Sequence, residues 1–181
     1  DSEVIGPEDM FTFANQATRD VNRTQMETIN SKLTSIEERL KDMDSMDIDI
    51  QALSPAPPQY YYNIEPELGL LSSQIINNRI AEIVSEYPDR FVGLGTVPMQ
   101  EPRLAVTELE RMINELGMRG VEICTNVAGE ELSADRFKNF FAKAEELDAL
   151  IFMHPNGFSE GRRLADHYLI NVIGNPLDST V

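Results

Sequence analysis

The sequence predicts an α/β fold with a parallel sheet, because short apolar strands alternate with amphipathic helices along most of the chain. From about residue 46 onward the alternation is regular, at a spacing typical of successive βαβ units. The predicted strand over residues 149–153 is nearly all apolar, as expected for a strand covered on both faces. A doubly wound sheet and a (β/α)8 barrel both fit, and both place functional groups at the carboxyl ends of the strands.

The first predicted unit begins with a strand over residues 48–53, in which apolar and polar side chains alternate. A proline-rich loop over 54–58 ends this strand, and three consecutive tyrosines follow at 60–62. Apolar residues at helical spacing then predict a helix that stops near Pro88.

The second unit begins with a strand over residues 91–97, ended by Pro98. Pro102 fits the first turn of a helix, and Gly117 suits the position just after its end. Gly93 and Gly95 resemble a dinucleotide fingerprint, but they lie within the strand, and Pro98 stands where the third glycine should be. Close packing against neighbouring backbone is the better explanation for the two glycines.

The remaining pattern predicts a strand over 121–124, a helix with Ser133 as its N-cap, the strand over 149–153, and a helix over 163–173 that ends at Gly174. Four strands are too few for a closed barrel, which takes roughly 250 residues. On the barrel interpretation, the chain is therefore about half of a barrel.

The first 45 residues differ from the rest. Residues 11–47 are polar and helical in pattern, with a loose apolar stripe. We therefore expect two regions: an N-terminal helical excursion over 1–45 packed on the barrel, and a partial (β/α) barrel over 46–181.

The composition excludes several classes of protein. The net charge of −16 repels phosphate backbones and argues against a nucleic-acid partner. No apolar run has the roughly 20 residues of a membrane span, and no signal peptide begins the sequence. The lone cysteine, Cys124, cannot form an internal disulfide and fits a small buried side chain. These features predict a cytoplasmic location.

His154 is the main candidate for chemistry, because it directly follows the apolar strand and precedes Pro155. At a strand end, a neutral imidazole nitrogen is placed to bind a divalent metal, although a structural histidine fits the local sequence equally well. His167, in a polar helical stretch, fits a surface or packing residue better.

Four further residues are candidates for substrate binding. Asn126 and Asn156 each follow a predicted strand and would reach the same rim. Arg23 and Arg39 have the side chain that grips a carboxylate through a bidentate fork.

An ordered series of short motifs over roughly residues 36–181 resembles the amidohydrolase superfamily, in the branch containing aminocarboxymuconate-semialdehyde decarboxylase and related aromatic-acid decarboxylases. The motifs are Arg39-Leu40-Lys41-Asp42-Met43-Asp44 leading into 48–54, Tyr87-Pro88-Asp89-Arg90-Phe91 leading into 95–100, Gly117-Met118-Arg119-Gly120-Val121, Ile151-Phe152-Met153-His154-Pro155 and Val172-Ile173-Gly174-Asn175-Pro176.

The resemblance implies a (β/α)8 barrel of the metal-dependent hydrolase type that binds one divalent metal ion and no organic cofactor. Zinc is the metal expected first, and manganese is the alternative. It implies non-oxidative decarboxylation of a small unsaturated or aromatic carboxylic acid, and a homodimer. His154 matches the metal ligand after the fifth barrel strand. Arg23, or alternatively Arg39, is the candidate for binding the substrate carboxylate.

The sequence departs from the family pattern in one respect. The first-strand motif that supplies two metal ligands is absent, and no histidine precedes His154. We therefore expect the other ligands and the catalytic proton donor to lie outside this segment. A metal-dependent hydrolase and a non-catalytic truncated barrel are the alternatives.

Overall fold

The structure, a computed structural model, describes residues 15–155 and 164–180. Its strands are β1 Gln51–Leu53, β2 Phe91–Gly95, β3 Gly120–Cys124, β4 Asn126–Val127, β5 Glu130–Glu131 and β6 Leu150–His154. Its α-helices are α1 Gln16–Thr34, α2 Ile36–Ser45, α3 Pro66–Glu86, α4 Pro102–Asn114, α5 Lys138–Glu146 and α6 Asn175–Asp178.

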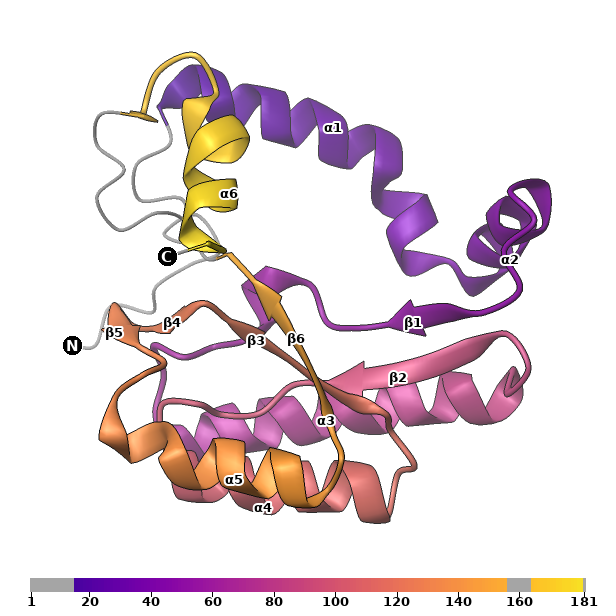
Figure 1. Cartoon of the computed structure of the whole chain (residues 1–181). Coiled ribbons are helices and arrows are strands. Elements are labelled where there is room, and N and C mark those ends of the chain that lie inside the picture. The colour runs from indigo at the N-terminus through magenta and orange to yellow at the C-terminus, as the bar shows by residue number, and fades with distance from the viewer. Residues whose placement is uncertain (1–14, 156–163, 181) are drawn as a thin grey trace.

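The main sheet is parallel, with the strand order β1-β2-β3-β6. Each strand therefore lies beside its predecessor in the predicted series, as in successive βαβ units, and the expected α/β half-barrel is confirmed. Helices α3, α4 and α5 cover one face of this sheet, while α1 and α6 lie on the other side (Figure 1). We call the face covered by α3, α4 and α5 the outer face, and the opposite face the inner face.

Much of the hydrophobic core lies between the outer face and its helices. Phe91 of β2 and Val121 of β3 are fully buried there, together with Leu109 and Met112 of α4 and Phe140 of α5. Burying a large apolar side chain of this kind stabilises a fold by about 1.5–3 kcal/mol. This core holds the helices against the sheet.

A buried polar network ties the end of β2 to two helices. The Asn77 side chain accepts a hydrogen bond from the backbone N–H of Thr96 at 2.8 Å and donates to the Thr96 carbonyl at 2.9 Å. Asn77 also donates to Glu108 at 2.7 Å, and Glu108 accepts two bonds from Arg111, at 2.7 and 2.9 Å. The side chains of Asn77, Glu108 and Arg111 have partners in this network, whereas the buried Thr96 hydroxyl has none among the described residues.

Gly93 and Gly95 are in a strand and closely packed, as predicted, but against side chains instead of backbone. A Cβ on Gly95 would lie 2.6 Å from both Asn77 Oδ1 and Met112 Cε, and one on Gly93 would lie 3.1 Å from Ile80 Cγ2. The glycines therefore let α3 and α4 approach the sheet.

The first strand is shorter than the predicted 48–53. The Arg90 side chain donates hydrogen bonds to the carbonyls of Ile48, at 3.3 Å, and Asp49, at 3.0 Å. Because a side chain occupies these carbonyls, regular pairing with β2 begins only at Gln51. The predicted strand over 91–97 likewise ends early, at Gly95.

The predicted helical stretch over 11–47 is two helices within its described part. Ser35 is extended (φ −95°, ψ 121°), and its hydroxyl accepts a hydrogen bond from the Glu38 N–H at 3.2 Å. This is an N-cap interaction, so Ser35 ends α1 and starts α2. Thr18 is the buried residue of α1, and the division into regions 1–45 and 46–181 stays a prediction.

Two local predictions differ from the structure, one agrees, and one hairpin was not predicted. A 3-10 turn over Asp135–Phe137 precedes α5, so Ser133 is not its N-cap. A π-helical turn over Ile170–Gly174 continues directly into α6, so Gly174 does not end the last helix. The hairpin of β4 and β5 was not expected. Gly117 has the predicted left-handed backbone, with φ +66°.

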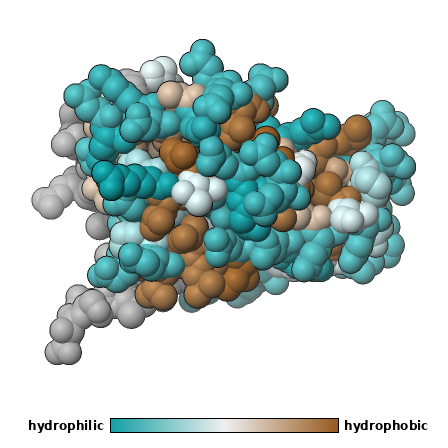
Figure 2. Space-filling model, turned by 90° about the horizontal axis from the view of Figure 1, so that it is seen from below, coloured by the Kyte–Doolittle hydropathy of each residue, from teal (hydrophilic) through white to brown (hydrophobic). Residues whose placement is uncertain are grey.

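The outside of the helical layer is mixed in polarity. Figure 2 views the molecule from below Figure 1, and apolar side chains show between polar ones. On α3, the exposed large apolar side chains are Leu68, Leu71 and Ile75. Within the described residues, no helix combines the length and the hydropathy needed to cross a bilayer.

Candidate functional site at the carboxyl end of the sheet

His154 is the last residue of β6, at the predicted strand end, and its side chain is half-buried. Its Nδ1 lies 2.7 Å from the carbonyl oxygen of Pro155. With the proton on Nδ1, this contact is a hydrogen bond, and Nε2 keeps the lone pair that a metal ion requires. An outer contact of this kind commonly fixes the orientation of a metal-ligating histidine.

The register of the sheet shows which side chains share the face of His154. The outer-face residue Gly95 pairs with Val121, so the next residue, Glu122, points to the inner face. Glu122 pairs with Phe152, and Cys124 pairs with His154. Glu122, Cys124 and His154 therefore lie on the inner face, near the carboxyl ends of β3 and β6.

Two of the three consecutive tyrosines cover Glu122. Tyr60 and Tyr62 are buried and stacked, with ring centroids 5.8 Å apart and an interplanar angle of 24°, whereas Tyr61 is exposed. The Tyr60 hydroxyl donates a hydrogen bond of 2.5 Å to Glu122 Oε1. The loop after β1 therefore reaches across β2 to the middle of β3.

This cluster perturbs its own titratable groups. Burial, reinforced by Glu122, raises the pKa of the Tyr60 phenol. Burial also raises the pKa of Tyr62 and of the Cys124 thiol. The cysteine is thus a buried, neutral thiol, as its place within a strand predicts.

Asn126 is the second residue beyond the end of β3 and the first of β4, at the predicted rim. Its side-chain Oδ1 accepts a hydrogen bond of 3.0 Å from the Gly129 N–H. Ala128 and Gly129 both have positive φ, as in a type I′ turn, so Asn126 helps to close the β4–β5 hairpin. Asn156 lies outside the described residues. Substrate binding by either asparagine stays a prediction.

The two arginine candidates have partners other than His154. Arg23 is exposed on α1 and forms an ion pair with Asp20 at 3.0 Å. Arg39, on α2, donates to Gln51 Oε1 at 3.0 Å and to the Leu33 carbonyl at 3.1 Å. Gln51 begins β1, so Arg39 lies at the amino end of the sheet, opposite the end that carries His154. Their roles stay predictions.

The described residues include no group of three or more His, Cys, Asp or Glu side chains arranged to hold a metal ion. His154 thus supplies one donor atom of the expected type, and a stable site needs more. The expectation that the other ligands lie outside this segment stays a prediction.

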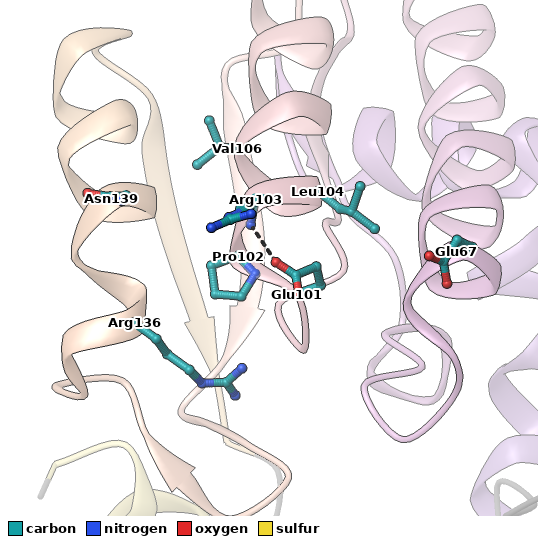
Figure 3. Close-up of a pocket in the computed structure, with 8 residues that line it drawn as sticks. All are labelled: Glu67, Glu101, Pro102, Arg103, Leu104, Val106, Arg136 and Asn139. Carbon is teal, nitrogen blue, oxygen red and sulfur yellow. Dashed lines mark hydrogen bonds between the residues drawn. The ribbon is translucent and has the colours of Figure 1, made fainter.

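A cleft of about 750 Å³ lies among the amino ends of the outer helices and contains none of the predicted site residues. Its lining includes Arg103 at the start of α4 and Arg136 before α5 (Figure 3). Arg136 is paired with Glu130 at 2.7 Å, and the Arg103 N–H donates to Glu101 at 3.3 Å. We assign no function to this cleft.

Glu122 was missed by the sequence predictions. A carboxylate inside the strand Val121-Glu122-Ile123-Cys124, whose other side chains are apolar, was the available signal. Such a residue is almost never fully buried unless it is paired.

Comparison with known proteins identifies the family. The chain is 35% identical over 151 residues to 2-amino-3-carboxymuconate-6-semialdehyde decarboxylase from Dictyostelium discoideum, covering 83% of this chain and 42% of that protein. The structure matches 5-carboxyvanillate decarboxylase from Sphingomonas paucimobilis with a TM-score of 0.71 at 28% identity, covering 78% of this chain and 44% of that one. It also matches the 5-carboxyvanillate decarboxylase from Novosphingobium aromaticivorans complexed with manganese and 4-hydroxy-3-methoxy-5-nitrobenzoic acid (TM-score 0.69, 28% identity, 75% and 39% coverage).

The chain therefore spans less than half the length of these relatives. The profile of the amidohydrolase family matches residues 30–174, which is most of the chain. The half-barrel with His154 at the end of β6 belongs to the amidohydrolase family.

Proposed function

We propose that the protein is a metal-dependent, non-oxidative decarboxylase of a small unsaturated or aromatic carboxylic acid. The observation that carries this proposal is the position of His154, with Nε2 available at the carboxyl end of a parallel strand, in a chain whose relatives include decarboxylases. In such a reaction the bond between the ring or alkene carbon and the carboxylate breaks, carbon dioxide leaves, and a proton replaces it on carbon.

A divalent metal bound through His154 would supply Lewis-acid chemistry and orient the substrate. Zinc is our first expectation, and manganese, which the Novosphingobium aromaticivorans relative holds, is the second. Among the described residues only His154 is assigned as a ligand, so we place the remaining ligands and the proton donor outside this segment.

The chain's own residues suit a flat ligand. The stacked rings of Tyr60 and Tyr62 lie on the inner face that also carries His154, and planar molecules stack favourably on such rings. Asn126 and Asn156 are proposed to bind the substrate at the rim, and Arg23 or Arg39 to bind its carboxylate. We further propose a cytoplasmic homodimer.

A non-catalytic barrel is the second candidate. It is favoured by the lack of a group of three or more potential metal ligands among the described residues and by the exposure of Leu150, Phe152 and Met153 on β6. Such a protein would retain the fold and bind no metal.

The test measures bound metal and carbon dioxide release on the protein expressed from its complete coding region. We expect near one equivalent of zinc or manganese and release of carbon dioxide from a panel of aromatic acids. His154→Ala should abolish both, whereas His167→Ala, a matched control at an exposed histidine, should retain both. Stoichiometric metal with ester or amide cleavage alone would favour a hydrolase, and absence of metal would favour the non-catalytic barrel.

A further inference from the structure

The two oxygens of the Glu122 carboxylate are in different situations. Oε1 accepts the 2.5 Å hydrogen bond from Tyr60, while Oε2 is buried and has no hydrogen-bond partner among the described residues. The residue as a whole is 2% exposed. A buried acceptor without a donor is costly, so it calls for a specific explanation.

The other buried carboxylate among the described residues, Glu108, has hydrogen-bond partners for both of its oxygens. Glu108 lies on the outer side and is 1% exposed, and the donor to both oxygens is Arg111. The same chain therefore satisfies one buried carboxylate completely and leaves the other with one oxygen open.

Glu122 is within reach of the ligand expected at His154. Cys124, two residues further along β3 on the same face, pairs with His154. Strand geometry then puts the Cα atoms of Glu122 and His154 about 8 Å apart, from a rise of ~3.3 Å per residue and a strand spacing of ~4.8 Å. One substituted benzene ring can bridge that gap between the two side chains.

We propose that Glu122 is a binding residue of the inner face, whose free Oε2 accepts a hydrogen bond from a hydroxyl or amino substituent of a planar carboxylic acid. Tyr60 fixes the carboxylate through the other oxygen. This inference rests on the proposed function and adds to it the chemistry of one substituent of the substrate.

The charge of the carboxylate sets the orientation of the ligand. An ionised carboxylate only accepts hydrogen bonds, so it attracts a donor and repels the carboxylate of the ligand. The ligand carboxylate therefore points away from Glu122.

Entry to this position requires a shift of the covering ring. Tyr62 lies between the 3-10 turn Pro57–Gln59 and α3, outside the strands, so its ring can move without breaking the sheet. The stacked Tyr60 ring then provides a flat surface for the ligand.

The test is isothermal titration calorimetry on the manganese-loaded protein expressed from its complete coding region. The probes are benzoate, meta-hydroxybenzoate, meta-aminobenzoate and meta-methoxybenzoate, which keeps the oxygen but has no donor. We expect the hydroxyl and amino compounds to bind about tenfold more tightly than the other two, the usual gain from a hydrogen bond to a charged group. Glu122→Leu should reduce this preference to less than twofold, and Glu108→Gln, the matched control, should keep it.

Equal affinity of the four probes, failure of all four to bind, or an unchanged preference in folded Glu122→Leu would each overturn the inference. The comparison of hydroxyl with methoxyl needs only the wild-type protein, so equal affinity overturns the inference even if Glu122→Leu does not fold. Glu122→Gln, which keeps the size of the side chain and removes its charge, should then weaken the preference. Carbon dioxide release is measured separately: a donor preference without release keeps the role of Glu122 and refutes the decarboxylase, and release without a preference does the reverse.

Discussion

The two faces of the sheet differ in how completely their side chains are buried and hydrogen-bonded. On the outer face, Phe91 is 1% exposed and Glu108 has both oxygens paired. On the inner face, Phe152 is 47% exposed and Glu122 keeps one oxygen without a donor among the described residues. Phe91 lies on the interior strand β2 and Phe152 on the edge strand β6, so both the position in the sheet and the covering elements contribute to the difference.

This difference suggests that the outer face mainly stabilises the fold and that the inner face carries the candidate binding groups. The outer face is packed by helices of this chain, and its residues contribute mainly to the free energy of unfolding. The inner face carries His154, Glu122 and the stacked tyrosines. It also exposes Leu150 and Phe152 of β6 and leaves Glu122 Oε2 without a hydrogen-bond partner among the described residues. Binding groups commonly sit on a scaffold stabilised elsewhere.

Truncating one phenylalanine on each face should give the largest contrast. Phe91→Ala should lower the free energy of unfolding by about 3–5 kcal/mol, because it opens a cavity in a packed core. Phe152→Ala should cost less than about 1 kcal/mol, because half of its side chain is already in water. Urea denaturation of the 181-residue chain measures both. Equal costs would mean that the inner face is as well covered as the outer one.

Neutralising the two buried carboxylates should give the next largest contrast. Glu108→Gln should cost about 2–3 kcal/mol, because it replaces charged hydrogen bonds to Arg111 and turns an amide N–H₂ toward a cation. Glu122→Gln should cost less than about 1 kcal/mol, because its amide oxygen still accepts from Tyr60 and its other atom had no partner to lose. The denaturant midpoints of the two variants measure these costs. A large loss of stability in Glu122→Gln would mean that Oε2 has a hydrogen-bond donor in the fold.

High pH should destabilise the protein through the inner face. The pKa values of Tyr60, Tyr62 and Cys124 are raised in the fold above their ordinary values of 10.0, 10.0 and 9.0. Below about pH 8 these groups are protonated in both states and their contribution to stability is complete. As the pH rises further, the unfolded chain loses protons that the fold retains, and stability falls by about 2 kcal/mol between pH 8 and 10.

The variant Tyr60→Phe/Tyr62→Phe should show a shallower alkaline loss, measured as the denaturant midpoint against pH. Tyr87→Phe is the control, since Tyr87 lies at the end of α3. A double variant as pH-sensitive as the wild type would show that other groups cause the loss.

The alternation of strands and helices and the order of the strands were predictable because they depend on hydrophobic patterns within short stretches of sequence. Alternating apolar strands and helices predicted the parallel order of the four strands, and the apolar run before His154 predicted its place at a strand end. Gly117 was predictable because only a left-handed backbone position favours glycine so strongly.

Features that depend on distant partners were not predictable. Tyr60 and Glu122 are 62 residues apart, so no local sequence pattern predicts their hydrogen bond. Arg90 shortened β1 by bonding carbonyls that precede it by 41 and 42 residues. Arg39 has the right chemistry for a carboxylate, but its partner is Gln51 at the other end of the sheet.

The smallest effect is expected where α6 is held on the side of the sheet away from α3, α4 and α5 (Figure 1). One of the interactions that hold it is the hydrogen bond from the Thr125 hydroxyl, just beyond β3, to Asp178 of α6. Thr125→Val should cost at most about 1 kcal/mol of global stability, since one hydrogen bond contributes that much. Its main effect should be local, seen as faster amide hydrogen exchange in residues 170–178 with α4 unchanged.

Thr107→Val is the matched control, because Thr107 bonds only within α4, to the Arg103 carbonyl at 3.1 Å. It should leave exchange in residues 170–178 as in the wild type. Faster exchange throughout the chain in Thr125→Val would mean that α6 is part of the same cooperative unit as the outer core. Faster exchange confined to residues 170–178 would mean that this segment opens independently of the core that keeps the outer face folded.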